Sequence, residues 1–141
     1  MATIRAYTTI EQGRKLAEIL PLESADMWWS WYSSPLSNGH YDDFPMFCKP
    51  VCNTDESVPC WSLVALLGAL RVFTTPTAFS VKVSTPSLIK TENGYKLIYV
   101  GDYTPMINNG LDTETPIESV ADNPIDACYE MIIKLNELNL L

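Results

Sequence analysis

Apolar positions recur at helical spacing near the start of the chain, in the segment TTIEQGRKLAEILP. Thr8 and Glu11 have the spacing of a capping box, in which two side chains satisfy backbone donors of the first helical turn, and Thr9 and Gln12 have the same spacing. The pattern predicts a helix that begins at one of these caps and ends at Pro21. The side chains expected to face inward are Ile10, Leu16, Ala17 and Leu20.

A second amphipathic pattern lies at the end of the chain, in ADNPIDACYEMIIKLNELNLL. Asp122 or Asn123 is expected to cap this helix, with Pro124 at its first position. Acidic Asp126 would lie in the first turn, beside the positive end of the helix dipole. The residues expected on the buried stripe are Ile125, Cys128, Ile132, Leu135 and Leu138.

Alternation between apolar and polar positions, together with aromatic residues, predicts a strand from Met27 to Tyr32. A continued helix is the alternative. In a strand, Met27, Trp29 and Trp31 share one face, which we expect to be the core face. Trp28 and Tyr32 lie on the other face and are the candidate binding residues, because exposed Trp and Tyr are enriched at interface hot spots.

Residues 33–58 carry Pro, Asn-Gly, Asp and Ser, which predicts a long loop with room for one short strand. A helix is then expected over residues 59–70. Pro59 suits a first helical position, since its fixed φ is helical and its N–H is not needed there. Because PCWSLVALLGAL is apolar on all sides, this helix is predicted to be buried at the centre of the fold.

The segment from residue 78 to residue 103 is typical of a sheet. Residues 78–84 alternate, with Phe79, Val81 and Val83 on one side. Residues 87–103 contain Asn93-Gly94 between apolar stretches, which predicts a hairpin with a type I′ turn and three antiparallel strands in all. Residues 115–120 are either a short strand or an ordered loop. The predicted fold is a single α+β domain over residues 1–141, with about three helices packed on a small, mainly antiparallel sheet and a buried central helix.

Composition excludes some classes of function. Among 141 residues, 17 acidic and 9 basic side chains give a net charge of −8, and the basic residues are not clustered. A nucleic-acid-binding protein needs a basic stripe, and anionic membranes repel an acidic surface, so we expect neither nucleic acid nor membrane as a partner. The longest apolar run, Leu63 to Leu70, is too short to span a bilayer. The first residues lack the apolar core of a secretory signal, which favours a cytoplasmic location.

Three segments carry a resemblance to known proteins: GRKLAEILPLESADMWW, VPCWSLVALLGAL and NPIDACYEMIIKLNELNLL. They resemble a family of small uncharacterised proteins from gut bacteria and their phages or mobile elements. Together the three segments cover roughly a third of the chain, and variable loops join them. It implies a shared fold and an origin on a mobile element, and it implies no activity, cofactor or catalytic residue.

The pair Cys60-Trp61 at the start of the predicted central helix resembles the nucleophile segment of papain-like cysteine peptidases. A helix N-terminus stabilises a thiolate, which would activate Cys60. The general base would be His40, the only histidine of the chain. It precedes the cysteine, whereas the papain-like order places histidine after it. A cysteine hydrolase using Cys60 and His40 is therefore an alternative to a buried, structural cysteine.

His40, Cys48, Cys52 and Cys60 are ligand types that zinc binds tetrahedrally, and a metal would stabilise a long loop. Only Cys48 and Cys52 have a short spacing, so a zinc-stabilised binding module is a second alternative. The first expectation is that the protein needs no cofactor. We expect a small acidic accessory or interaction protein without catalysis, encoded by a phage or mobile element. It would bind a protein partner or a second copy through Trp28, Tyr32 and the loop from Pro35 to Phe47.

Overall fold

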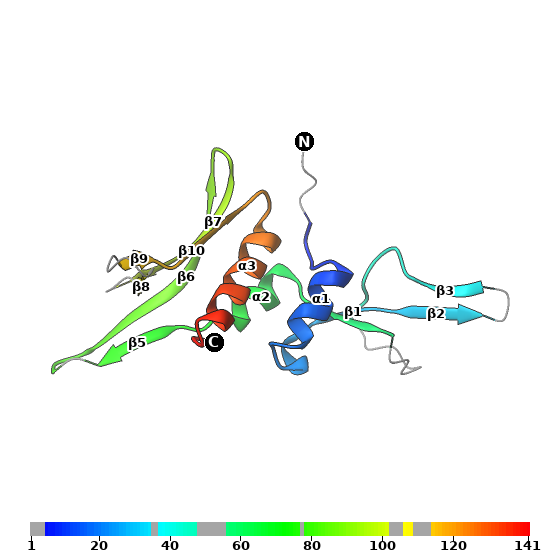
Figure 1. Cartoon of the computed structure of the whole chain (residues 1–141), viewed down its shortest axis with the longest axis horizontal. Coiled ribbons are helices and arrows are strands. Elements are labelled where there is room, and N and C mark those ends of the chain that lie inside the picture. The colour runs from blue at the N-terminus through cyan, green and yellow to red at the C-terminus, as the bar shows by residue number, and fades with distance from the viewer. Residues whose placement is uncertain (1–4, 35–36, 48–55, 77, 102–105, 109–113) are drawn as a thin grey trace. The chain divides into compact units, whose positions relative to one another are not determined.

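The chain folds into α-helices and antiparallel strands, which is the predicted α+β class (Figure 1). The computed structural model describes residues 5–34, 37–47, 56–76, 78–101, 106–108 and 114–141. Two compact units are present. Unit 2 comprises residues 6–69, and unit 1 comprises Arg5 and residues 70–141. The single domain predicted over residues 1–141 stays a prediction.

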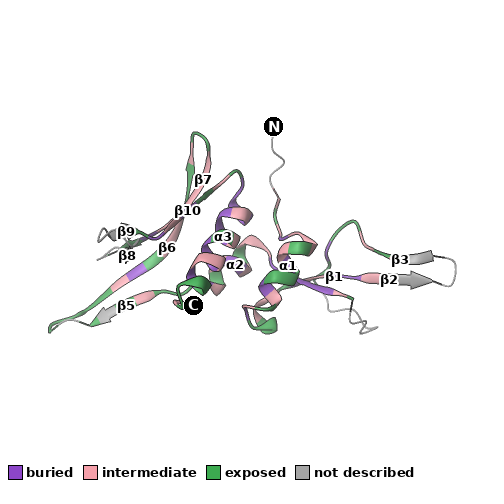
Figure 2. Ribbon diagram, in the orientation of Figure 1, coloured by how far each residue is buried: buried purple, intermediate pink, exposed green. Residues whose placement is uncertain are grey.

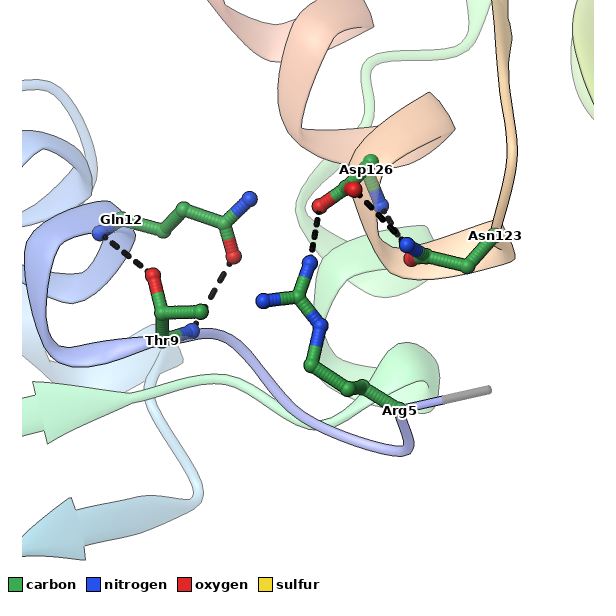
Figure 3. A network of polar contacts seen from close by, with 5 residues as sticks. All are labelled: Arg5, Thr9, Gln12, Asn123 and Asp126. Carbon is green, nitrogen blue, oxygen red and sulfur yellow. Dashed lines mark hydrogen bonds and ion pairs between the residues drawn. The ribbon is translucent and has the colours of Figure 1, made fainter. Parts of the chain in front are cut away.

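Unit 2 begins with a helix that matches its predicted cap. Thr9 Oγ1 accepts a hydrogen bond from the Gln12 backbone N at 3.1 Å, and Gln12 Oε1 accepts one from the Thr9 N at 3.0 Å (Figure 3). Of the two capping boxes that the sequence allows, the pair Thr9 and Gln12 is the one formed. The elements of unit 2 are α1 (Ile10–Ala17), the 3-10 helix η1 (Leu22–Ser24), β1 (Met27–Trp29), β2 (Trp31–Ser34), β3 (Ser37–Tyr41), β4 (Val58–Cys60) and α2 (Leu63–Ala69).

The core of unit 2 forms around β1 and β4, which pair antiparallel with Met27 opposite Cys60 and Trp29 opposite Val58. These four side chains are buried and contact one another. Trp29 Nε1 donates a hydrogen bond to the Thr8 carbonyl at 3.2 Å, so its polar atom is satisfied inside the core. The prediction that Met27 and Trp29 face inward is confirmed.

Trp31 is half-buried, so the prediction that it belongs to the core is wrong. The predicted strand from Met27 to Tyr32 is interrupted at Ser30, and Trp31 begins β2, which pairs with β3 instead of β4. Trp31 packs edge-on against Tyr41, with ring centroids 4.8 Å apart. It also lies against Gly39, whose φ is +89° and where a Cβ would be 2.5 Å from the indole ring.

The helix expected over residues 59–70 is present as α2 but begins at Leu63, so its predicted start at Pro59 is wrong. Pro59 lies in β4 opposite Trp28, in a two-stranded sheet where a strand edge tolerates a missing N–H. Ser62 caps the helix instead, and its Oγ accepts from the Ala65 N at 3.2 Å. Leu66 is the one buried residue of α2, and Val64 is 79% exposed. The prediction that this helix is buried on all sides is therefore wrong.

Unit 1 is a helix packed on an antiparallel sheet with strand order β10-β7-β6-β5 (Figure 1). Helix α3 contacts β7 and β10, and Leu97 and Tyr99 of β7 are buried. Phe73 packs edge-on against Tyr99, with centroids 4.9 Å apart. The elements are β5 (Phe73–Pro76), β6 (Val81–Thr91), β7 (Gly94–Gly101), β8 (Met106–Asn108), β9 (Glu114–Pro116), β10 (Glu118–Ala121) and α3 (Pro124–Glu137).

The predicted hairpin is present between β6 and β7, but its turn is not type I′. Thr91 pairs with Gly94, so Glu92 and Asn93 are the two loop residues. A type I′ turn needs positive φ at both loop residues, whereas here the positive φ, 146°, is at Gly94.

The strands before this hairpin also differ from the prediction. Residues 81–91 form one continuous strand. Pro86 lies within it, opposite Tyr99 of β7 and beyond the part of β6 that pairs with β5. Phe79 lies outside a strand and is fully exposed, since β6 begins only at Val81. The expectation that Phe79 shares a strand face with Val81 and Val83 is therefore wrong.

Helix α3 carries the buried stripe that its sequence predicts, and buried residues follow its length in Figure 2. Ile125, Cys128, Ile132 and Leu135 have no exposed surface. Leu138 is 37% exposed, because the helix ends at Glu137 and Leu138 is its C-cap. The prediction that Leu138 belongs to the buried stripe is therefore wrong.

The start of α3 is fixed by polar contacts within unit 1. Asn123 Oδ1 accepts a hydrogen bond from the Asp126 N at 2.9 Å, and Asn123 Nδ2 donates to Asp126 Oδ2 at 2.7 Å. Arg5 forms an ion pair with the other oxygen of the same carboxylate (Figure 3). Between the two predicted caps, Asn123 is the one used.

Replacing Asn123 by alanine is expected to lower the free energy of unfolding by about 1 kcal/mol, because the helix loses its capping acceptor. Asn136→Ala is the matched control, since Asn136 is exposed in the same helix and alanine has the higher helix propensity. Urea unfolding of the two variants measures the difference. Equal losses in both variants would contradict the capping role.

Candidate functional site

Cys60 does not lie at a helix N-terminus, which corrects the basis of the cysteine-hydrolase hypothesis. It is the last residue of β4 and is fully buried. Its Sγ donates to the Thr8 carbonyl and accepts from Thr8 Oγ1, both at 3.5 Å. Burial raises the pKa of the Cys60 thiol, and this outweighs the lowering by the hydrogen bonds with Thr8. The thiol is therefore protonated at neutral pH, whereas a nucleophile needs the thiolate.

The other predicted catalytic and metal-binding residues are placed only in part. His40 is exposed in β3, opposite Tyr32 of β2. Cys48 and Cys52 lie outside the described residues, so the predicted zinc set of His40, Cys48, Cys52 and Cys60 stays a prediction. Within the described residues, no group of three or more His, Cys, Asp or Glu side chains is arranged to hold a metal ion.

The predicted binding residue Trp28 is the middle residue of β1 and has a backbone neighbour on each side. Pro59 of β4 lies opposite it on one side. On the other side, the Trp28 N donates to the Met46 carbonyl at 2.7 Å and the Met46 N donates to the Trp28 carbonyl at 2.8 Å. Residues directly opposite in an antiparallel pair project to the same face, so Trp28 and Met46 lie side by side. Trp28 is half-buried there, and the side chain of Tyr32 is outside the described set.

Three large apolar side chains are exposed where the chain passes β1. Phe44 is 69% exposed, Met46 is 51% exposed and Phe47 is 76% exposed, whereas Pro45 between them is buried. We call Phe44, Met46 and Phe47 the apolar patch. The two hydrogen bonds between Met46 and Trp28 hold this segment against β1, so the patch has a fixed backbone anchor.

This segment belongs to the predicted binding loop from Pro35 to Phe47, but the three residues of the apolar patch were not among the predicted binding residues. A signal was present in DDFPMF, where two phenylalanines and a methionine interrupt a loop that is otherwise rich in Pro, Asp, Ser and Asn. Such residues are either folded into a core or left for a partner. Sequence alone does not distinguish these two fates, because an alternating apolar stretch is equally typical of a short buried strand.

Among the described residues, no helix has both the length and the apolar character that crossing a membrane requires. The comparisons with protein-family models, with curated protein sequences and with solved structures find no match to this chain.

Proposed function

We propose that this protein is an interaction module without catalysis of its own, which binds a partner protein through the apolar patch of Phe44, Met46 and Phe47. The observation that carries the proposal is the exposure of all three side chains within four residues, beside half-buried Trp28. Aromatic residues and methionine are enriched at protein interfaces, and methionine adapts its shape to a partner surface. The sequence resemblance supports an accessory protein of a phage or mobile element.

The charge around the patch favours one kind of partner. Asp42 and Asp43 directly precede Phe44, and the whole chain has a net charge of −8. A complementary surface would have an apolar groove with lysine or arginine at its rim, because opposite charges assist encounter and orientation. A second copy of this chain would bring the aspartates of both copies together, so self-association is disfavoured.

The double variant Phe44→Ser/Phe47→Ser tests this proposal. Peptides are first selected against the native protein from a displayed random library. We expect the selected peptides to combine apolar with basic residues and to bind the double variant at least tenfold more weakly. Val64→Ser is the matched control, because Val64 is 79% exposed on α2 and lies outside the patch. Far-UV circular dichroism and urea unfolding should be nearly unchanged in both variants, since the substituted side chains are exposed.

Equal affinity of the selected peptides for the native protein and the double variant would overturn the proposal. Sedimentation analysis tests whether a second copy of the chain binds to the apolar patch instead. A dimer of the native protein that dissociates in the double variant would identify a second copy as the partner in place of a basic, apolar protein surface.

A further inference from the structure

A pocket of about 440 Å³ lies in unit 2 between α1, Tyr41 at the end of β3, and β4. Its apolar lining comes from Ala17, Val58 and Pro59. Its polar lining includes Arg14, Tyr41 and Glu56. This volume is in the range of pockets that bind small organic molecules, and a mostly apolar lining with a few polar groups is their usual composition. The pocket is separate from the apolar patch, because none of Phe44, Met46 and Phe47 lines it.

Arg14 is held in this pocket by an aromatic residue and not by an acid. Its Nη2 donates a hydrogen bond to Tyr41 Oη at 2.7 Å, and its guanidinium carbon lies 5.8 Å from the centre of the Tyr41 ring. Tyr41 Oη in turn donates to the Glu56 carbonyl at 2.7 Å. The tyrosine hydroxyl thus uses its single proton on Glu56 and accepts from Arg14, which fixes the guanidinium at the pocket wall.

The guanidinium keeps capacity for an anion. It has five N–H donors, and the bond to Tyr41 uses one of them. The ion pairs of the described residues involve Arg5, Lys15 and Lys96, and none of them includes Arg14. In a chain with 17 acidic and 9 basic residues, a fixed arginine without an ion pair among the described residues is a candidate anion-binding group.

The charge of the surroundings selects a monoanion. Glu56 also lines the pocket, and the net charge of the chain is −8, so a phosphate dianion would meet more repulsion than a carboxylate. A planar carboxylate matches the guanidinium fork and accepts two parallel hydrogen bonds from it. The apolar lining of Ala17, Val58 and Pro59 suits the hydrocarbon part of the same molecule.

We infer that this pocket binds a small apolar carboxylic acid, with the carboxylate on Arg14 and the apolar body against Ala17, Val58 and Pro59. Benzoate is a suitable probe because it combines the two parts in one compact molecule. Titration of the ¹⁵N-labelled protein with benzoate is expected to give saturable amide shifts in residues 13–17 and 56–58 and at Tyr41. Benzyl alcohol, which has the same ring without the charge, should bind at least tenfold more weakly, and inorganic phosphate should also bind more weakly.

Two variants of Arg14 make the test specific. Arg14→Gln removes the charge and should weaken benzoate binding at least tenfold. Arg14→Lys keeps the charge but loses the planar fork, so its affinity should be intermediate. It also keeps the test decisive if the glutamine variant fails to fold. Phe44→Ser/Phe47→Ser should bind benzoate as the native protein does, which separates this inference from the proposed function. The inference is overturned if benzoate gives no saturable amide shifts or if benzyl alcohol binds as tightly as benzoate. It is also overturned if Arg14→Gln leaves the affinity for benzoate unchanged.

Discussion

Gly13→Ala is expected to destabilise the protein by roughly 1–2 kcal/mol, although alanine is the better helix former. Gly13 is buried in α1, and an added Cβ would lie 2.3 Å from the Pro59 carbonyl oxygen and 3.0 Å from a methyl carbon of Val58. The first of these contacts is with backbone, so α1 or β4 has to shift as a whole. Overpacking of this kind costs about 1–3 kcal/mol or more, which outweighs a helix-propensity gain of at most about 1 kcal/mol.

Gly68→Ala is the matched substitution in α2, and the opposite sign is expected. Gly68 is exposed, and an added Cβ would meet no heavy atom within 4 Å. Neither Gly13 nor Gly68 has positive φ, so backbone strain affects neither comparison. Alanine should therefore stabilise α2 by about 0.5–1 kcal/mol, through helix propensity and the reduced entropy of the unfolded chain. Urea unfolding of both variants measures the two changes in the free energy of unfolding. Stabilisation by both substitutions would show that α1 is not in close contact with β4.

Cys128 is expected to make the protein lose stability at alkaline pH. Burial raises the pKa of this thiol from its ordinary 9.0 to about 12, and Cys128 has no exposed surface. The unfolded chain therefore releases the proton first as the pH rises above about 9, and thiolate formation favours the unfolded state until the pH reaches the folded-state value. The free energy of unfolding should be unaffected by this thiol below about pH 8. It should fall by about 1.4 kcal/mol per pH unit above 9, which is on the order of 4 kcal/mol by pH 12.

Comparison with Cys128→Ala isolates this contribution. Tyr99 adds a loss of its own, because burial raises its pKa from 10.0 to about 12, but both proteins contain Tyr99 and its effect cancels in the difference. Urea unfolding at pH 7 and pH 10.5 should show that the native protein loses about 2 kcal/mol more than the variant. If the free energy of unfolding changes with pH in the same way in the two proteins, Cys128 ionises as easily in the folded as in the unfolded chain.

Local signals predicted the first and the last helix well. The capping box of Thr9 with Gln12, the cap at Asn123 and the buried stripe of α3 depend on residues three or four positions apart, so sequence spacing alone determines them. The α+β class followed from these helices and from the apolar alternation of the strands. The type I′ assignment at Asn93-Gly94 was wrong because the strand register moved the loop back by one residue.

Pairing between distant segments was the part that the sequence could not predict. Val58 to Cys60 form β4 because β1 lies beside them, and without that partner Pro59 is equally typical of a helix start. The same pairing buries Cys60 in a strand, which removes the helix dipole on which its activation as a nucleophile depended. The Arg14 pocket was missed for a related reason, since Arg14 and Tyr41 are 27 positions apart and neither carries a motif.

The ion pair between Arg5 and Asp126 has a consequence for the order in which the protein is assembled during translation. Residues 6–69 form unit 2, so every residue of that unit has been synthesised once Ala69 is added to the chain. Unit 1 includes Arg5 but has to wait for Asp126 and the rest of α3, which packs on β7 and β10. Because the chain is synthesised from its N-terminus, the contacts within unit 2 can form while unit 1 is still being made. Arg5 can therefore form its ion pair only after Asp126 has been synthesised, when unit 2 is already complete.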